Sequence, residues 1–468
     1  MENSKLACLL KKLDGYQWRS LSTFVESPFH NTNEEVISLF RYLHLAWQEG
    51  FSEKALIRET AYAELFPNQP YHYQHLNQLM SNLLKLAEKW LALQQLENAQ
   101  PLLEILKAEE LLKLGLDKHY RQAGRTATEA LNNYPIHSEQ YYYSYKLKSL
   151  EELHFVKQNQ RRANPALQQA SDSLDDFYAL NKLRYSCEML NRQRLFWPQT
   201  YHFPMMDALI AHLRSQDLRQ KVLLQLYFQL FLLLSEEQET HQNFDRYVAI
   251  FDEYRQKISK EEARALLYYA INFCIGKVRY GERAYAEKLF GLYQRGLNEK
   301  ILLESDSLSP WTYKNMVKLG LNLKKYDWVE WFVRHFAPYL PQKERKDAMH
   351  YNLAELYFFQ GRHEAALGEL REVEFTDIHY NLGGKALLAK IYYEAKQWEA
   401  LESLLASFLV FLRRNKAVSQ KVKEPYTNFV RLLSTIIRSL PERYGDLAQK
   451  IKEVKVINNR DWLLRQLE

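Results

Sequence analysis

The chain of 468 residues is longer than one hydrophobic core usually supports, so we expect two or more domains or an extended repeat array. Hydrophobic residues make up 47% and charged residues 26% of the chain, which excludes an intrinsically disordered protein. The net charge is +6, and the scarcity of glycine (14) and proline (13) favours long helices joined by short loops.

The first hundred residues (1–100) are predicted to form an N-terminal helical unit. Its helices are expected within residues 3–13, 16–26, 36–47, 52–66 and 71–96. Thr32-x-x-Glu35 has the spacing of a capping box, in which a hydroxyl and a carboxylate satisfy the first amide donors of a helix. We therefore expect Thr32 to begin the third helix.

Residues 101–300 are predicted to form an array of long helices with degenerate repeats. The expected helices cover residues 101–115, 119–132, 138–160, 166–193 and 217–235, followed by a pair near 260–297. The most apolar stretch, Val222 to Leu234, has 13 residues, whereas a membrane span needs about 20. It is interpreted as a buried helix, and no membrane insertion is expected.

The strongest pattern lies in residues 301–410. Within 351–374, apolar and small residues occupy helical spacing around Gly361, at Leu353, Ala354, Tyr357, Ala366, Leu370 and Val373. Small residues let two helices approach closely, and glycine permits the backbone conformation that ends the first helix. This segment resembles a tetratricopeptide repeat, which implies an α-solenoid of antiparallel helix pairs.

Two neighbouring copies are less regular, so these repeats are described as tetratricopeptide-like (TPR-like). The pattern recurs 35 residues later, where Trp398 opens the second helix and Lys396 replaces the turn glycine. One period upstream, Trp328 is aligned with His363, which places Trp331 where a small residue is expected. That degenerate copy is expected to start at Ser309-Pro310, with serine as the N-cap.

Residues 411–468 are predicted to form basic C-terminal capping helices, because a terminal repeat needs a polar outer face. Residues 411–456 carry 11 Lys/Arg and 4 Asp/Glu, a net charge of +7, so attraction for an acidic partner would belong to this end. The residues predicted to contact such a partner are Arg413, Arg414, Lys416, Lys421 and Lys423.

The segments SPFHNTNEEVISLF, SPWTYKNMVKLG and the run from YNLAELYFFQGRHEAALGELREVEF to FLVFLRRNK carry a second resemblance. Together they resemble a widespread group of uncharacterised helical-repeat proteins of Bacteroidota-type bacteria. The resemblance spans most of the chain. It implies a repeat fold and a bacterial cytosolic setting, but it implies no activity.

The sequence contains no HExxH zinc pair, no glycine-rich phosphate loop and no GxSxG nucleophile elbow. Its three cysteines, Cys8, Cys187 and Cys274, lack metal-ligand spacing and are interpreted as reduced thiols in the cytoplasm. We therefore expect a protein that is not an enzyme and that needs no metal or cofactor.

The predicted function is that of a non-enzymatic scaffold or adaptor that binds a protein or peptide partner on its concave face. In a tetratricopeptide array the first helices line that face, which predicts contacts from Tyr313, Met316, Lys324, Tyr351, Glu355, Phe358, Phe359, Lys390, Tyr393 and Glu394. For each aromatic residue, burial against a neighbouring repeat stays open. The alternative function is a nucleic-acid-associated regulator that uses the basic C-terminal end and the N-terminal unit. No feature of the sequence specifies an oligomeric state.

Overall fold

The computed structural model describes residues 1–158, 163–195, 200–235, 240–279, 281–374, 378–415 and 418–468. The chain forms two compact units, Met1–Lys182 and Leu183–Glu468, and the division falls within helix α9 (Pro165–Leu195). In the described residues, regular structure is helical except for one two-stranded hairpin, which confirms the all-α class. The finer boundaries expected at residues 100, 300 and 410 stay predictions.

The first part of the N-terminal unit is built around helix α5. Its elements are α1 (Lys5–Leu10), α2 (Gly15–Val25), α3 (Glu34–Gln48), the 3-10 helix η1 (Glu53–Leu56), α4 (Arg58–Leu65) and α5 (Tyr73–Asn98). Helix α5 contacts α1, α2 and α3, and the fully buried Trp18 lies in the shared core, 5.6 Å from the Phe40 ring. The indole of Trp90 on α5 donates a 3.1 Å hydrogen bond to Ser20 Oγ.

Two local predictions for this part are wrong. Asn33, not Thr32, caps α3, because its Oδ1 accepts the amides of Glu35 at 3.0 Å and Val36 at 3.1 Å. The helix expected over residues 52–66 is broken at Ile57, whose ψ of 132° is extended, so η1 and α4 form separately.

The second part of this unit comprises α6 (Gln100–Lys113), α7 (Asp117–Asn133), α8 (Glu139–Lys157) and the beginning of α9. Helices α6 and α7 pack against each other, with the fully buried Ala108 and Ala127 in their shared core. The Tyr120 hydroxyl on α7 donates a 3.1 Å hydrogen bond to the Leu150 carbonyl on α8.

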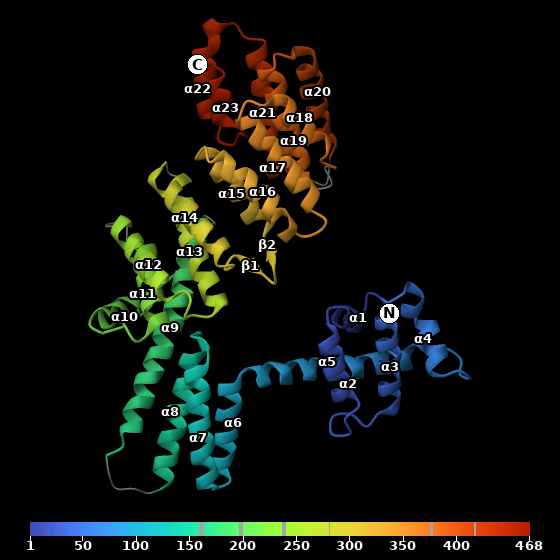
Figure 1. Ribbon diagram of the computed structural model, residues 1–468, viewed down its shortest axis with the longest axis vertical. Helices are drawn as coiled ribbons and strands as arrows, with labels where there is room; N and C mark the ends of the chain where they lie inside the picture. Colours follow the sequence, from blue (N-terminus) through green and yellow to red (C-terminus); the bar gives the residue numbers. More distant parts are fainter. Residues whose placement is uncertain (159–162, 196–199, 236–239, 280, 375–377, 416–417) are drawn as a thin grey trace. The chain divides into compact units, whose positions relative to one another are not determined.

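The C-terminal unit continues from α9 as a series of helices, coloured from green to red toward the C-terminus in Figure 1. They are α10 (Met206–Arg214), α11 (Val222–Ser235), α12 (Thr240–Tyr254), α13 (Lys260–Arg279), α14 (Ala284–Asn298), α15 (Pro310–Asn322), α16 (Tyr326–Phe336), η2 (Ala337–Tyr339), α17 (Arg345–Phe359), α18 (His363–Arg371), α19 (Ile378–Glu394), α20 (Trp398–Arg414), α21 (Gln420–Ile437), η3 (Pro441–Arg443), α22 (Tyr444–Glu453) and α23 (Arg460–Arg465). Helix α10 was not predicted from the sequence.

Helices of the C-terminal unit pack in sequential pairs, as in a helical solenoid. Close pairs are formed by α11 with α12, α13 with α14, α15 with α16, α17 with α18, and α19 with α20. The first helices of the last three pairs also touch in order, α15 with α17 and α17 with α19, and α19 then touches α21. We refer to α15, α17 and α19 as the first-helix row.

A short hairpin precedes this row. Strands β1 (Leu303–Glu304) and β2 (Ser307–Leu308) are antiparallel, with Leu303 opposite Leu308. Both turn residues, Ser305 and Asp306, have positive φ, the backbone that a tight two-residue hairpin needs. Ser-Asp is not the Asn-Gly type of signal that marks such turns, so the hairpin was not predicted.

One residue in the left-handed conformation ends the first helix of each of the last three pairs. Lys324, Gly361 and Lys396 have φ values of 56°, 75° and 56°. After each of them, the next amide donates a hydrogen bond to the carbonyl five residues earlier, as from Arg362 to Tyr357 at 2.8 Å. This arrangement is a Schellman motif, and each second helix begins two residues after the left-handed residue.

These turns fix the register of the repeats and correct the sequence alignment. The left-handed residues are 37 and 35 residues apart, so Tyr326, not Trp328, corresponds to His363 and Trp398. Three residues into each second helix, Val329, Ala366 and Leu401 are fully buried. Trp331, which was expected at this small-residue position, is 48% exposed.

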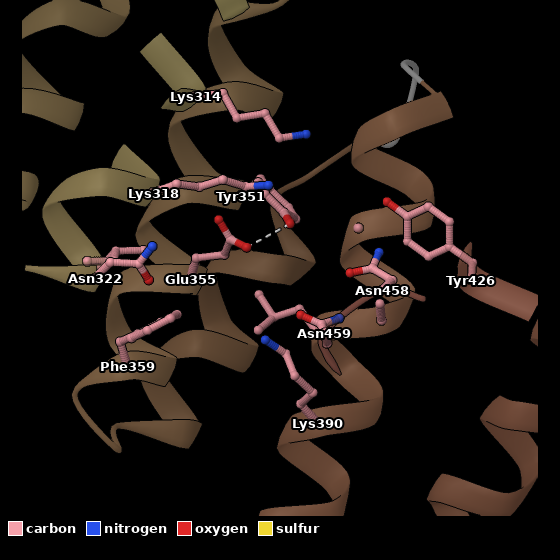
Figure 2. A pocket seen from close by; sticks show the side chains of 14 residues that line it. Lys314, Lys318, Asn322, Tyr351, Glu355, Phe359, Lys390, Tyr426, Asn458 and Asn459 are labelled. Carbon is pink, nitrogen blue, oxygen red and sulfur yellow. Dashed lines mark hydrogen bonds between the residues drawn. The ribbon is translucent and has the colours of Figure 1, made fainter. Parts of the chain in front are cut away.

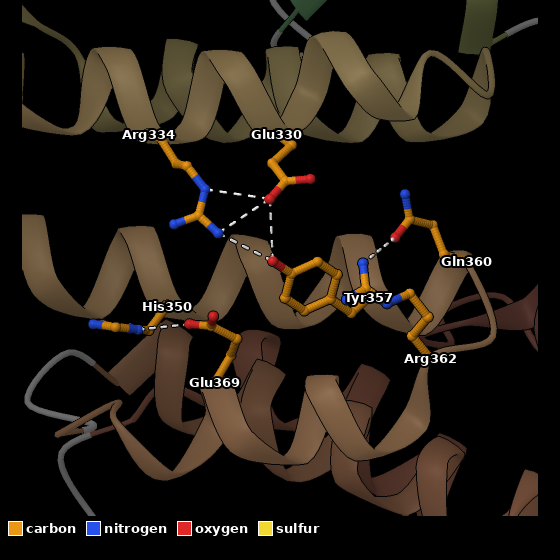
Figure 3. Close-up of polar contacts among 7 residues, drawn as sticks. All are labelled: Glu330, Arg334, His350, Tyr357, Gln360, Arg362 and Glu369. Carbon is orange, nitrogen blue, oxygen red and sulfur yellow. Dashed lines mark hydrogen bonds and ion pairs between the residues drawn. The ribbon is translucent and has the colours of Figure 1, made fainter.

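Polar contacts join α16, α17 and α18 (Figure 3). Glu330 Oε1 on α16 accepts hydrogen bonds from Arg334 Nη2 at 3.1 Å and from the Tyr357 hydroxyl on α17 at 3.2 Å. On another turn of α17, His350 Nδ1 lies 2.7 Å from Glu369 Oε2 on α18. These contacts hold α17 between the preceding and the following helix.

The left-handed turn predicts opposite effects for reciprocal substitutions. Because a side chain in this conformation costs roughly 1–2 kcal/mol, offset in part by the unfolded-state entropy of glycine, Lys396→Gly is expected to raise the free energy of unfolding by about 0.5–1 kcal/mol. Gly361→Lys is expected to lower it by a similar amount. Urea denaturation of the full chain measures both changes.

Gly368 provides the matched control, because it lies within α18 and a Cβ added there meets nothing within 4 Å. Gly368→Lys is expected to raise the free energy of unfolding by about 0.5–1 kcal/mol, since lysine favours a helix interior over glycine. Equal signs for Gly361→Lys and Gly368→Lys would contradict the assignment of the turn.

Candidate functional site

A cavity of about 180 Å³ opens on the first-helix row (Figure 2). Each helix of the row contributes to its lining, and α21 and the segment before α23 complete it. The lining residues are Lys314, Lys318, Leu321 and Asn322 on α15, Tyr351, Glu355 and Phe359 on α17, Gly383, Ala386, Leu387 and Lys390 on α19, Tyr426 on α21, and Asn458 and Asn459 before α23.

The register of the turns explains why these side chains gather. Residues ten, six and two positions before the left-handed residue are four apart, so they lie on one face of each helix. On α15 these positions hold Lys314, Lys318 and Asn322, and on α17 they hold Tyr351, Glu355 and Phe359. On α19 the first two positions hold Ala386 and Lys390, which also line the cavity. The cavity therefore follows from the repeat itself.

Tyr351 and Glu355 form the hydrogen-bonded centre of this face. The Tyr351 hydroxyl donates a 3.0 Å hydrogen bond to Glu355 Oε1, one turn further along α17. Burial, followed by the Glu355 charge, raises the pKa of Tyr351, so this phenol stays a donor. Gly383 on α19 makes room for it, since a Cβ at that position would lie 2.7 Å from the hydroxyl oxygen.

Lys390 places a buried ammonium group at the cavity. The residue is only 5% exposed, and its Nζ lies 4.4 Å from the centre of the Phe358 ring. Within the described residues, Nζ makes no hydrogen bond or ion pair. Burial lowers the pKa of Lys390 to about 8, although the charges of Glu355 and Glu394 act in the opposite direction.

The far edge of the cavity is held by hydrogen bonds to α21. The Asn458 amide donates a 3.1 Å hydrogen bond to the Pro425 carbonyl, and Asn428 Nδ2 donates to the Val456 carbonyl at 2.8 Å. Burial raises the pKa of Tyr426 to about 12, so this phenol is neutral at physiological pH. The cavity thus presents hydroxyl and amide groups opposite its lysines.

Seven of the ten residues predicted to contact a partner lie in or beside this region. Tyr351, Glu355, Phe359 and Lys390 line the cavity, and Phe358 contacts the Lys390 ammonium. The other two of the seven, Tyr393 and Glu394, hold α23. Trp462 on α23 donates a 2.7 Å hydrogen bond to Glu394 Oε1 and lies edge-on to the Tyr393 ring.

Two of the three residues chosen from the degenerate copy require correction. Tyr313 and Met316 are fully buried, and the Tyr313 hydroxyl donates to the Val333 carbonyl on α16 at 2.9 Å, so neither has surface for a partner. Lys324 is exposed at the turn and does not line the cavity, and its contact with a partner stays a prediction. The alignment on Trp328 set the register two residues off, and alignment on the turn would have selected Lys314, Lys318 and Asn322.

The residues predicted to meet an acidic partner do not line the cavity. Arg413 and Arg414 are exposed at the end of α20, where positive charge also favours the helix dipole. Lys421 is exposed and Lys423 half-buried near the beginning of α21. Lys416 lies outside the described residues.

Comparison with models of known protein families, with curated proteins and with solved structures found no significant match. Among the helices of the described residues, none has the length and apolarity to span a membrane. Across those residues, His, Cys, Asp and Glu side chains also form no group of three suited to hold a metal ion.

The buried ammonium of Lys390 predicts a stability cost that depends on pH. The pKa of about 8 in the folded chain lies below the ordinary value of roughly 10.4, so burial of the charged form destabilises the folded state. This penalty is full below pH 8 and disappears as the pH rises toward 10.4. Lys390→Met is expected to raise the free energy of unfolding by about 1–3 kcal/mol at pH 7, and by less at pH 9.5.

Urea denaturation at both pH values measures the difference between Lys390→Met and the parent chain. Lys343, exposed in the loop before α17, supplies the control, and Lys343→Met is expected to stay within about 0.5 kcal/mol at either pH. A loss of stability in Lys390→Met that is equal at pH 7 and 9.5 would show that the ammonium group is not buried at a cost.

Proposed function

We propose that the protein is a non-enzymatic α-solenoid scaffold or adaptor that holds a protein or peptide segment against the first-helix row. We also propose that its C-terminal pairs are TPR-like and that it acts in the cytoplasm of a bacterium, in line with the helical-repeat proteins it resembles. The observation that carries the binding proposal is the cavity, because helices of three successive pairs contribute to it.

Three features support TPR-like pairs. Each pair is closed by a left-handed residue, and two residues later the second helix begins. Its fourth residue is fully buried, at Val329, Ala366 and Leu401. Helices α15 and α16 approach each other closely at Gly320, since a Cβ added there would lie 2.5 Å from Val329 Cγ2.

The chemistry of the row suits a peptide of mixed character. Phe359 is 36% exposed and offers an apolar contact, while the exposed Lys318 and Asn322 offer a charge and an amide. A peptide laid along a solenoid row gains affinity from such alternating contacts over several repeats. None of these side chains forms the nucleophile and base arrangement of a hydrolase, which favours binding over catalysis.

A photo-reactive amino acid tests the proposed surface directly. With p-benzoylphenylalanine at position 359, irradiation of cells of the source organism is expected to give a discrete covalent adduct with another protein, identified by mass spectrometry. The same amino acid at Glu364, exposed on the second helix of that pair, is the matched control and should give no such adduct. Lys318→Glu should lower the yield at position 359. Adducts of equal yield at both positions, or none at 359, would refute the proposal.

A nucleic-acid-associated regulator remains the alternative, favoured by the net charge of +7 in residues 411–456 and by the exposed Arg413, Arg414 and Lys421. Phosphate contacts release counterions, so this alternative requires affinity that falls steeply between 50 and about 200 mM salt. The scaffold proposal expects no saturable binding of a fluorescent 20-base DNA or RNA by anisotropy at about 150 mM salt. Tight binding that is lost in Arg413→Gln/Arg414→Gln would favour the alternative.

A further inference from the structure

Two oppositely charged side chains of the cavity on the first-helix row do not pair with each other. Lys390 on α19 is 5% exposed, Glu355 on α17 is half-buried, and both line the cavity. Among the described residues, no ion pair of 4 Å or less joins them, and the Lys390 amine makes no hydrogen bond. The cavity is therefore lined by a buried ammonium group and by a carboxylate that stays apart from it.

The second acidic residue near Lys390 is engaged elsewhere. Glu394 acts on Lys390 by its charge, but its two oxygens lie 3.0 Å from His363 Nε2 and 2.7 Å from Trp462 Nε1. Glu394 therefore holds α18 and α23 to the end of α19, and it does not line the cavity. An anion that pairs with the Lys390 amine has to come from a ligand.

Glu355 lacks one hydrogen bond. Its Oε1 accepts from the Tyr351 hydroxyl at 3.0 Å, but its Oε2 is buried and has no partner within the described residues. A buried carboxylate oxygen without a donor destabilises the fold, so a ligand that donates a hydrogen bond to this oxygen is favoured. A positively charged donor is favoured most, because hydrogen bonds between two charged groups are the strong ones.

Lys318 on α15 adds a second amine at the rim of the cavity. Lys318 is exposed and makes no hydrogen bond or ion pair within the described residues. Figure 2 shows the Lys318 and Lys390 side chains pointing toward the space beside Glu355. A carboxylate has two oxygens, so it can accept hydrogen bonds from both amines. Lys314 also lines the cavity but has interactions of its own, one of them with the Tyr380 ring.

The size and the apolar walls of the cavity limit the rest of the ligand. Its volume of about 180 Å³ is below the roughly 300–1,000 Å³ of sites for drug-sized molecules, so a compact ligand fits best. The buried side chains of Leu321 and Leu387 supply apolar walls. A small apolar group on the ligand would lie against them.

We propose that this cavity binds a free α-amino acid with a small apolar side chain. Its carboxylate pairs with the amines of Lys390 and Lys318, and its ammonium group donates to Glu355 Oε2. A simple anion would leave Oε2 without a donor, and a simple amine would leave Lys390 without an anion, whereas a zwitterion supplies both. This binding does not rest on the proposed scaffold function, since a molecule of this size fills the cavity without a partner protein.

L-Alanine tests the proposal against two analogues that each lack one of its charges. Isothermal titration calorimetry of the full chain at pH 7 is expected to show saturable binding of one L-alanine. Propionate lacks the ammonium group and ethylamine lacks the carboxylate, so each is expected to bind at least about tenfold more weakly. L-Tryptophan carries both charges but has a bulky side chain, and it is also expected to bind more weakly than L-alanine.

Substitutions assign each charge of the ligand to its partner in the cavity. Glu355→Gln and Lys390→Met are each expected to weaken L-alanine binding at least about tenfold, since each removes a charge-assisted contact. Glu355→Gln should also abolish the preference for L-alanine over propionate, and Lys390→Met the preference over ethylamine. A residue that only supports the fold would not change these two preferences separately.

Exposed positions supply the matched controls. Lys343→Gln, in the loop before α17, and Glu364→Gln, on α18, remove the same charges away from the cavity and should leave the affinity for L-alanine unchanged. Lys318→Gln is expected to weaken L-alanine binding several-fold. Because Lys318 is exposed, this variant keeps the test valid even if Lys390→Met folds poorly.

Three outcomes would overturn the proposal. They are the absence of saturable L-alanine binding, an affinity for L-alanine that Glu355→Gln and Lys318→Gln leave unchanged, and tighter binding of the capped dipeptide acetyl-Lys-Glu-amide than of L-alanine. The last outcome would assign the cavity to charged side chains of a partner protein instead of a free amino acid.

Discussion

The left-handed residue that ends the first helix of each of the last three pairs is the constraint on which the first-helix row depends. It reverses the chain within two residues, and its Schellman hydrogen bonds satisfy carbonyl groups that the helix end would otherwise leave unpaired. Because the reversal is so short, it fixes which residues of the second helix meet the first. Gly361 adopts this backbone without a side-chain penalty, whereas Lys324 and Lys396 adopt it because the packed pairs on either side determine it.

The same turn determines the chemistry of the first-helix row. Counting back from it, positions four residues apart bring lysines from α15 and α19 to the Tyr351–Glu355 pair on α17. Burial shifts the pKa values of two of these groups in opposite directions. It raises the pKa of Tyr351, which stays neutral, and it lowers the pKa of Lys390. Buried polar and charged side chains stabilise the fold less than apolar side chains packed in the same place would. We therefore interpret the polar cavity as a binding site.

Periodicity in the sequence was sufficient for the helical class and for most helix positions, since long amphipathic stretches with few glycines and prolines leave little choice. It was insufficient where a short-range polar contact decides, as at Asn33, which outcompetes Thr32 as the cap of α3. Periodicity also failed where the repeat length changes. The turns at Lys324 and Gly361 are 37 residues apart instead of 35, so an alignment with a constant period of 35 matches Trp328 to His363 wrongly. Tyr351, Glu355, Phe359 and Lys390 were predicted since their copies carry clear turns, whereas Lys314 and Lys318 required the three-dimensional register.

The central claim is that the first-helix row buries the ammonium group of Lys390 beside its cavity. The most direct measurement is the NMR titration of Lys390 in the full chain labelled with ¹³C-lysine, assigned by comparison with Lys390→Met. The account predicts a pKa of about 8 for Lys390. A pKa near the ordinary value of roughly 10.4 would contradict it.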